Sequence, residues 1–469
     1  MRFVHLSESE YQAFVRSQDR FFYTQLPSYA AVRRSEGYDV DFFGLVDDSA
    51  PADATSVGAA PVGAASSSRE PGESGGEANG KSAGEAVVGV KAKDGGRIVG
   101  VASIVFRPWK RFFRRAIISY GPHLDWSDRE VVSTFFTKMR DYLAKERNIV
   151  SVRVNPPLER RYYEDITPSG ANPDAALFDS VMKELGAIKV NREFYESADI
   201  QMRYIYTKDL GSMTFDEAVA SCGQVVRTGF HRHGTNGVEV RMLEPSEFEV
   251  FEKLMEHTAQ RTDMSSISSS AFGFYRDLAA QLYPDECMMP AAVLDCDKYL
   301  SLIADERATI APKVAELEEH EAAAEAEGRK LGKKQRNALK EHRARLDVLA
   351  RREDETRAIK EAEGNEVILA ASFFVHSPNE LVNLLSGAYS QYQSYYGIYL
   401  IHRAMFEWAI EHGVRWYNFF GITGDFSEDA SDAGVLHFKR QFHGNVEEFV
   451  GTYDLPVRPV MARAVNAVG

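Results

Sequence analysis

The segment from Leu302 to Glu361 does more than any other to restrict the fold of this 469-residue chain. It is polar and helical in pattern, and its charge changes sign between Gly328 and Gly332. The first part carries the acidic side chains Asp305, Glu306, Glu316, Glu318, Glu319, Glu321, Glu325 and Glu327. The second part carries the basic side chains Arg329, Lys330, Lys333, Lys334, Arg336, Lys340, Arg343, Arg345, Arg351 and Arg352. We predict an antiparallel helical hairpin in which opposite charges face each other.

A thin apolar seam in the same segment supports the hairpin. Its members are Ile310, Val314, Leu317, Leu339, Leu346 and Leu349. A single long helix is the alternative, but it would have to cross two glycines. The segment is interpreted either as a solvated charged arm with no partner or as an arm that contacts RNA through its basic half.

Length and charge limit what the rest of the chain can be. A chain of 469 residues exceeds one hydrophobic core, so we expect two domains. The net charge of −14 disfavours nucleic acid or anionic lipid as a partner except at a local basic patch. We expect a cytoplasmic protein, because we find neither an N-terminal leader pattern nor an apolar run long enough for a membrane span. The three cysteines are too few and too irregularly spaced for a disulfide framework or a zinc ribbon.

Strand and helix patterns alternate irregularly, which favours an α+β fold over a doubly wound sheet. Residues 47–96 are rich in Ala, Gly, Ser, Pro and Glu, and we interpret them as a disordered insertion in a hairpin. The strands of that hairpin are expected at Tyr38–Val46 and Arg97–Phe106. From Phe215 onwards the second half repeats the same mixture of elements.

The stretch from Asn418 to Gly451 carries the most specific pattern, and we expect it to form part of an acyl-transfer active site. A strand at Trp416–Phe420 runs into Gly421-Ile422-Thr423-Gly424. An acidic loop follows, then Phe438-Lys439-Arg440-Gln441-Phe442-His443-Gly444 and Gly451-Thr452-Tyr453.

This order of motifs resembles the Fem-type aminoacyltransferases (FemA, FemB, FemX and MurM), which use aminoacyl-tRNA to build the interpeptide bridge of peptidoglycan. Three further segments resemble family motifs, namely residues 22–34, Val152–Pro156 and the basic helix end that runs from Arg227 to Val240. Outside residues 47–96 the resemblance covers nearly the whole chain.

The resemblance implies two acetyltransferase-like (GNAT) domains. They would span residues 1–190 and 191–447, with a coiled-coil arm at 302–361 inserted in the second. Residues 448–469 would return to the first domain. The implied co-substrate is aminoacyl-tRNA, with no cofactor. The acceptor would be lipid II or UDP-MurNAc-pentapeptide, and members with an arm resemble those that act on the lipid-linked precursor. We therefore expect a cytoplasmic protein that contacts the inner face of the plasma membrane peripherally. We also expect a monomer.

Phe438 and Lys439 match the family's Phe-Lys pair, in which the lysine lies beside the reacting centre. A cationic Lys439 would stabilise the oxyanion, or the leaving ribose oxygen, of an aminoacyl ester. The ester is already activated, so positioning and electrostatics suffice without a covalent intermediate. The alternative is a surface lysine in a loop.

Arginines occupy the positions where the family binds the diphosphate of its sugar-peptide substrate. These are Arg33 or Arg34 and, near a second contact, Arg232, while Arg227 lies in the same basic helix end. Arginine binds phosphate bidentately, although each of these side chains is equally compatible with a solvated surface position.

Asn155 departs from the family, whose strand end usually carries aspartate. An amide forms hydrogen bonds but cannot act as a general base. Tyr389 matches a tyrosine near the acceptor site, or it is a packed strand residue. For the arm, the resemblance makes Lys333, Lys334 and Arg336 candidate tRNA contacts.

Three rival functions remain open. An acetyl-CoA-dependent acyltransferase would need a glycine-rich pyrophosphate loop, and we find none. A leucyl/phenylalanyl-transfer enzyme acting on a protein or peptide amine would be shorter and lack the arm. A non-catalytic RNA-binding protein would tolerate the loss of Lys439. No metal site is expected, because His231 and His233 have no clear third ligand nearby.

Overall fold

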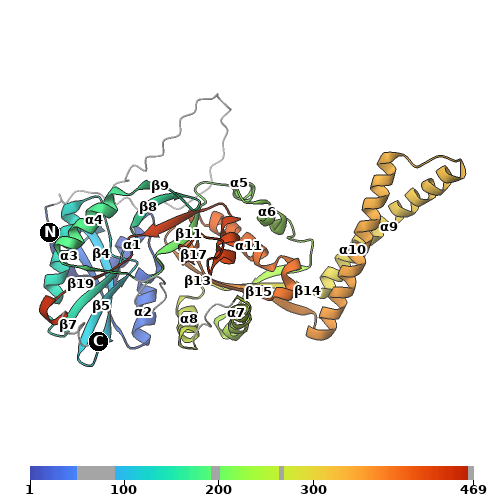
Figure 1. The fold of residues 1–469 in the computed structure, drawn as a ribbon. Coiled ribbons are helices and arrows are strands. Elements are labelled where there is room, and N and C mark those ends of the chain that lie inside the picture. The colour runs from blue at the N-terminus through green and yellow to red at the C-terminus, as the bar shows by residue number, and fades with distance from the viewer. Residues whose placement is uncertain (50–89, 192–200, 263–268, 463–469) are drawn as a thin grey trace.

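The protein has two mixed β-sheets with helices packed on them and a long helical arm (Figure 1). The computed structural model describes residues 1–49, 90–191, 201–262 and 269–462. The predicted insertion at 47–96 falls mostly outside these residues. On either side of it, however, Asp39–Asp47 (β2) pairs antiparallel with Arg97–Trp109 (β4), which confirms the predicted strand pair.

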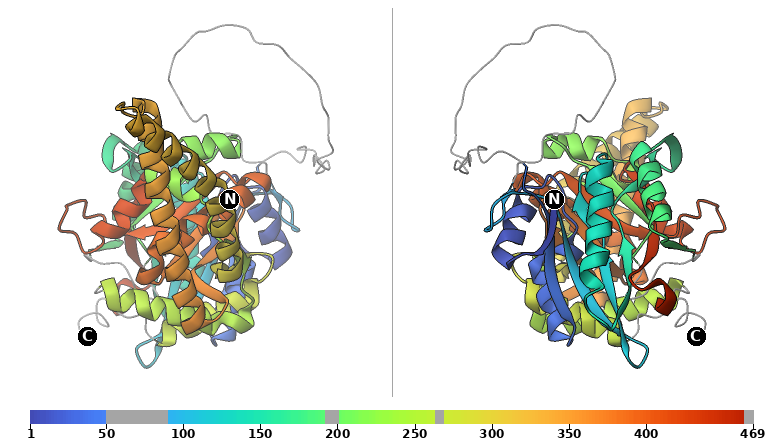
Figure 2. Two further views of the ribbon diagram at one scale, coloured as in Figure 1. Left: turned by 90° about the vertical axis from the view of Figure 1, so that its right-hand side faces the viewer. Right: turned by 90° about the vertical axis from the view of Figure 1, so that its left-hand side faces the viewer.

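The first sheet has the order β1-β2-β4-β5-β7-β19-β10, with β3 and β6 also paired to β4. Its other strands are β1 (Arg2–His5), β3 (Val90–Lys91), β5 (Phe113–Ser119), β6 (His123–Leu124), β7 (Ile149–Asn155), β10 (Ile188–Val190) and β19 (Thr452–Pro456). Four helices accompany this sheet, namely α1 (Glu8–Arg16), α2 (Pro27–Ser35), α3 (Arg129–Leu143) and α4 (Pro173–Glu184). Helices α3 and α4 share a core with one face of the sheet, which Figure 2 shows in its right-hand view.

The second sheet has the order β12-β14-β15-β16-β17-β11-β18-β8-β9, with β13 paired to β15. Its strands are β8 (Glu159–Glu164), β9 (Thr167–Ala171), β11 (Tyr204–Asp209), β12 (Val238–Met242), β13 (Cys287–Met288), β14 (Pro290–Asp295), β15 (Glu366–Ser377), β16 (Glu380–Ala388), β17 (Trp416–Ile422) and β18 (Asn445–Phe449). The helices around it are α5 (Phe215–Ala220), α6 (Gln224–Phe230), α7 (Phe248–Thr262), α8 (Ser269–Leu282), α11 (Gly397–Glu411) and α12 (Ala433–Arg440). This mixed architecture confirms the predicted α+β class.

The two halves share one apolar core and exchange strands. Tyr29 of α2 and Phe42 of β2 belong to the same buried cluster as Phe251 of α7 and Phe373 of β15. Strands β8 and β9 come from the first 190 residues but lie in the second sheet, whereas β19 lies in the first sheet between β7 and β10. The assignment of residues 1–190, 191–447 and 448–469 to domains stays a prediction.

The arm is a pair of antiparallel helices, α9 (Cys296–Ala326) and α10 (Lys333–Glu363). The predicted seam is confirmed, because all six of its apolar residues belong to one cluster between the helices. Ion pairs cross from leg to leg, with Arg343 on Glu318 at 2.9 Å and Arg345 on Glu306 at 2.6 Å. The hairpin is therefore correct, and each leg extends a few residues beyond the predicted limits.

Helices α5 and α6 are separated by a turn that ends at Gly223, whose backbone N–H donates to the carbonyl oxygen of Gln441 at 2.7 Å. In the described residues no helix is both long and apolar enough to cross a membrane.

Candidate functional site

Lys439 lies on helix α12, not in a loop, and its side chain is buried. The Nζ atom donates hydrogen bonds to the carbonyl oxygens of Gly421 at 2.6 Å and Phe420 at 3.2 Å. We call these two oxygens the carbonyl cradle. Within the described parts of the chain, Lys439 forms no ion pair. Burial lowers the pKa of the Lys439 amine to about 7, although the carboxylate of Asp432 opposes that shift.

The end of strand β17 turns so that these carbonyls reach Lys439. Phe420 has a φ of 62°, in the left-handed region that side chains other than glycine rarely occupy. Its backbone N–H donates to Oδ1 of Asn418 at 2.7 Å, which holds the turn. On the other side of the cradle, Thr423 donates to both carboxylate oxygens of Asp432, the residue before α12. The strand end and the helix that carries Lys439 are thus tied together.

Phe438 points into an aromatic cluster. Its ring lies 5.6 Å from those of Tyr399 and His402 and 5.3 Å from that of Phe442, measured between centroids. Burial and the neighbouring Lys439 lower the pKa of His402 to about 3, so this imidazole is neutral at physiological pH. Phe438 thus packs α12 against the core of the second sheet, next to Lys439.

Asn155 ends strand β7 and is buried. Its Oδ1 accepts hydrogen bonds from the Thr452 hydroxyl at 2.5 Å and from the Gln201 backbone at 3.4 Å. Its Nδ2 is buried without a hydrogen-bond partner in the described structure. Asn155 therefore has a buried donor for which the described residues supply no partner.

Asn155 and Lys439 are each linked to the same small aromatic cluster between the two halves of the chain. Gly121 donates its backbone N–H to the carbonyl of Asn155, and the preceding residue, Tyr120, stacks on Phe22 at 4.8 Å. Phe420 packs against this small cluster of Phe22, Tyr120, Ile205 and Phe449. The structure thus brings these two predicted residues into one region.

The predicted diphosphate-binding arginines have different environments. Arg33 is buried, pairs with Glu36 at 2.7 Å and lies over the rings of Tyr38 and Phe274. Arg34 is exposed and donates to the Val40 carbonyl at 2.8 Å. Arg33 thus contacts both halves of the chain, whereas Arg34 bonds within the first half, and the substrate role of each stays a prediction.

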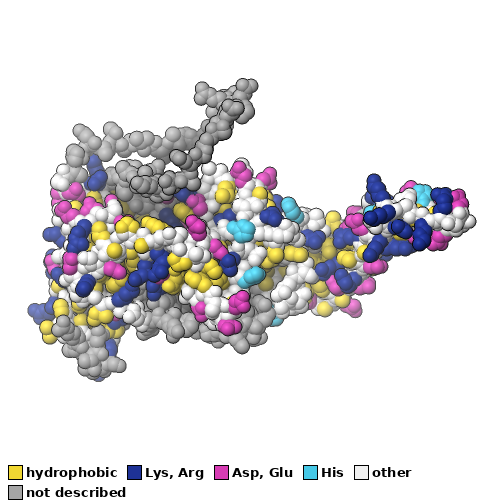
Figure 3. All heavy atoms as spheres, turned by 45° about the horizontal axis from the view of Figure 1, so that its top comes forward, with side chains coloured by type: hydrophobic (Ala, Val, Ile, Leu, Met, Phe, Trp, Pro, Cys, Tyr) yellow, Lys and Arg dark blue, Asp and Glu magenta, His cyan; other side chains and the backbone are white. Residues whose placement is uncertain are grey.

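The other predicted residues lie on the second sheet and the arm. Arg227 donates to the carbonyl of Cys222 at 2.5 Å, and the exposed Arg232 lies over the ring of Tyr396. Tyr389 is half-buried beside His257, at a ring distance of 5.0 Å. Lys333, Lys334 and Arg336 are exposed at the start of α10. Basic side chains gather on the arm in Figure 3, far from the carbonyl cradle.

A buried charge cluster between the two halves was not predicted from the sequence. Arg20, between α1 and α2, forms ion pairs with Glu380 of β16 and Glu447 of β18 at 2.5 and 2.9 Å. Burial, reinforced by Glu447 and opposed by Arg20, raises the pKa of nearby Glu159 to about 8. The detectable signal was Glu380 at the start of the largely apolar strand β16, because a buried carboxylate needs a partner.

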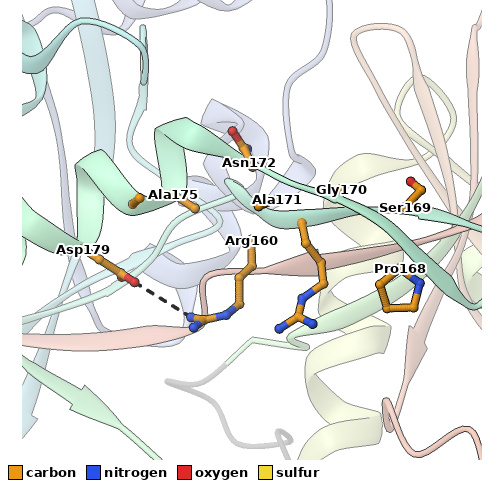
Figure 4. A pocket seen from close by; sticks show the side chains of 10 residues that line it. Arg160, Pro168, Ser169, Gly170, Ala171, Asn172, Ala175 and Asp179 are labelled. Carbon is orange, nitrogen blue, oxygen red and sulfur yellow. Dashed lines mark ion pairs between the residues drawn. The ribbon is translucent and has the colours of Figure 1, made fainter.

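Two open pockets lie near these elements. One, of about 540 Å³, is lined by Arg160 and Arg161 of β8, strand β9 and the start of α4; Figure 4 shows Arg160 directed towards Asp179. The other, of about 490 Å³, lies beside α12 and is lined by His437, Arg440 and His443. In the described residues no group of three or more His, Cys, Asp or Glu side chains is arranged to hold a metal ion.

With the two sheets and the buried Lys439 described, the sequence can be compared with known families. One family matches it over most of its length. The profile of the FemAB family matches residues 76–469, so the chain belongs to the FemAB family. The family predicted from the motifs is therefore confirmed.

Individual relatives agree with this assignment. The aminoacyltransferase FemA of Staphylococcus epidermidis is 29% identical over 378 residues, covering 80% of this chain and 87% of that protein. FemA of Staphylococcus aureus is 24% identical over 465 residues, covering 98% and 97%. The crystal structure of FemX superposes with a TM-score of 0.69 at 16% identity, covering 99% of both chains, which shows that the fold is shared. The chain is an aminoacyltransferase, as predicted.

Proposed function

We propose that this enzyme transfers an amino acid from aminoacyl-tRNA to the stem-peptide amine of a peptidoglycan precursor, lipid II, and so builds an interpeptide bridge. The FemA relatives support the aminoacyl transfer. The observation that carries the mechanism is the Lys439 amine, which is buried and held by the carbonyl cradle.

The reaction exchanges an ester for an amide. The acceptor nitrogen attacks the ester carbonyl carbon, an oxyanion forms, and the bond between that carbon and the ribose oxygen breaks. The amine loses a proton and the ribose oxygen gains one, so the products are an amide and free tRNA. The Lys439 ammonium stabilises the oxyanion and the departing ribose oxygen, because a cation in a water-poor site interacts strongly with developing negative charge.

Asn155 binds the acceptor without taking its proton. Its unpartnered Nδ2 donates to the acceptor peptide, and the attacking amine loses its proton to water. Positioning supplies the remaining rate enhancement, since the ester is already activated. The exposed residues Lys333, Lys334 and Arg336 bind the tRNA backbone. The enzyme works as a monomer at the inner face of the membrane that carries lipid II.

The proposal is tested by incubating the protein with a panel of charged tRNAs and either lipid II or UDP-MurNAc-pentapeptide. We expect wild type to consume one charged tRNA with lipid II and Lys439→Ala to do so about 10²–10³-fold more slowly. The matched control is Lys208→Ala, because Lys208 is also buried and also donates to a carbonyl, that of His443. If no charged tRNA is consumed with either acceptor, the proposed function is wrong. Consumption with the nucleotide-linked precursor alone would overturn the choice of lipid II.

A further inference from the structure

We infer that Arg20, Glu380 and Asn418 are positioning residues that hold the carbonyl cradle of Lys439 from across the boundary between the two halves. This inference rests on the proposed function for the role of Lys439 in transfer. It assigns a task to the buried charge cluster that none of the predicted site residues explains.

A continuous series of hydrogen bonds leads from Arg20 to Lys439. The Arg20 guanidinium donates to Glu380 Oε1 through Nη2 at 2.5 Å and Nε at 3.1 Å. The same oxygen accepts from Asn418 Nδ2 at 2.9 Å. Asn418 then uses its Oδ1 to hold the Phe420 N–H at 2.7 Å, and the Phe420 carbonyl accepts from Lys439. Arg20 is thus four hydrogen bonds away from the Lys439 amine.

Each member of this series is confined, so the series has little freedom to relax. Glu380 is 0% exposed and Asn418 is 1% exposed. The Arg20 guanidinium lies between the rings of Phe22 and Trp416, at 5.1 and 4.9 Å from their centroids. Burial raises the pKa of Glu380, and Arg20 opposes that rise. Separating the pair would leave the Glu380 carboxylate buried without its cation, which is costly.

The left-handed backbone of Phe420 is the point at which this confinement matters. A side chain other than glycine stays in that conformation only when its surroundings hold it there. Asn418 restrains the backbone of Phe420 through a hydrogen bond, and the aromatic cluster with Phe22 and Tyr120 restrains its side chain by packing. Both restraints depend on the first half of the chain. Without them, the turn would relax and the two carbonyls would no longer point at Lys439.

A second carboxylate in the cluster offers an internal comparison. Glu447 pairs with Arg20 and accepts from the Thr207 hydroxyl at 2.6 Å, but neither residue belongs to the series that reaches Lys439. One branch runs from Arg20 through Glu380 to Asn418, and the other runs through Glu447 to Thr207. If the cluster only joined the two halves, weakening either branch would change the pKa of Lys439 equally. If the inference is correct, only weakening the branch through Asn418 changes the pKa of Lys439.

The experiment measures the pKa of Lys439 directly in the full-length protein. Lysine labelled with 13C at Cε is observed by NMR across pH, and the Lys439 resonance is identified by its absence from Lys439→Met. The variants are Asn418→Ala, Arg20→Lys and, as the control in the same cluster, Thr207→Val. Circular dichroism and thermal melting identify any variant that has lost its fold, and Arg20→Lys keeps a cation for the buried carboxylates.

We expect Asn418→Ala to lower the pKa of Lys439, because the cradle favours the charged form and burial disfavours it. We expect Arg20→Lys to have a smaller effect in the same direction, and Thr207→Val to have none. In the transfer assay, Asn418→Ala should reduce kcat about tenfold or more and leave KM within about twofold, as expected for a group that acts in the transition state.

An unchanged or raised pKa of Lys439 in folded Asn418→Ala would overturn the inference. So would an equal effect of Thr207→Val. The NMR measurement needs no substrate, so it separates the two proposals. If wild type consumed no charged tRNA, the proposed function would fail, and if Lys439→Ala kept full transfer activity, the proposed role of Lys439 in transfer would fail. In either case the positioning of Lys439 would still be decided by its pKa.

Discussion

The Lys439 ammonium nitrogen lies 2.6 Å from the carbonyl oxygen of Gly421, and its charge is balanced by backbone dipoles. A carboxylate partner would have satisfied the charge more fully. Such a carboxylate would also have competed with the substrate for the ammonium, because a charge neutralised by an ion pair stabilises a developing oxyanion less. Two carbonyls orient the ammonium and leave most of its charge available.

The first prediction concerns loss of the amine. Lys439→Met should lower kcat by about 10²–10³-fold, the range measured when one oxyanion-stabilising donor is removed from an active site. The measurement is single-turnover transfer from charged tRNA. Lys208→Met is the control and should retain activity, because Lys208 lies on β11 outside the carbonyl cradle. Equal losses in the two variants would point to damaged folding.

The second prediction is a bend in the pH profile of kcat. An acceptor amine of ordinary pKa becomes tenfold more available per pH unit up to about pH 10. The charged fraction of Lys439 falls tenfold per unit above its pKa of about 7. Multiplied together, the deprotonated fraction of the acceptor amine and the charged fraction of Lys439 make kcat rise up to about pH 7 and stay constant above it. Lys439→Ala should lose the bend and keep rising; a wild-type profile that rises without a bend would contradict a cationic role.

The third prediction concerns stability and needs no substrate. The folded pKa of Lys439, about 7, is below the ordinary value of 10.5, so between these pH values the unfolded state binds one more proton. Stability therefore rises with pH in that window. The free energy of unfolding of wild type relative to Lys439→Met should increase by about 1.4 kcal/mol per pH unit from pH 7 to 10. Urea unfolding at several pH values measures this, and parallel curves would contradict it.

The fourth prediction separates Asn155 from Lys439. Asn155→Ala removes the unpartnered donor and the acceptor of the Thr452 hydroxyl bond. We expect KM for the peptidoglycan precursor to rise and kcat to fall less than about tenfold, because a binding group contributes equally to ground and transition states. A loss of kcat as large as that of Lys439→Met would mean that Asn155 takes part in the chemical step.

The fifth prediction concerns the arm. Changing Lys333, Lys334 and Arg336 to Glu should weaken tRNA binding and reduce the slope of log affinity against log salt by about 2, since each phosphate contact contributes about 0.7–0.9. The melting temperature should not change, because all three side chains are exposed. Lys138→Glu, Lys145→Glu and Lys183→Glu together make the same charge change on helices or turns of the first half and should leave binding within about twofold. Equal weakening in both sets would indicate only long-range attraction.

The sequence predicted those parts of the structure that depend on local pattern. The arm could be predicted from its charge pattern and its regular apolar seam. Both patterns are local, because the seam residues of α9 and α10 pack mainly on each other. The pair Phe438 and Lys439 could be identified from neighbouring motifs, but its placement on a helix could not. Helix α12 has only eight residues and no side-chain cap at its start, so its local signal is weak.

What could not be predicted depends on contacts between distant residues. Arg20 and Glu380 are separated by 360 residues, and neither lies in a motif. The left-handed Phe420 is held by Asn418 and by the first half of the chain, so no local propensity favours it. Strands β8 and β9 were also missed, because their polar sequence is stabilised by pairing, of β8 with β18 and of β9 with β8, and not by an apolar pattern of their own.

The place of β19 has a consequence for how the protein is made. This strand fills the gap between β7 and β10, and its Asp454 binds Arg153, which was synthesised 301 residues earlier. A growing chain on the ribosome therefore carries two open strand edges in its first sheet until β19 emerges. Open edges invite pairing with other chains, so chaperones are expected to protect this intermediate. Incomplete chains that end before β19 should aggregate instead of folding into a working half.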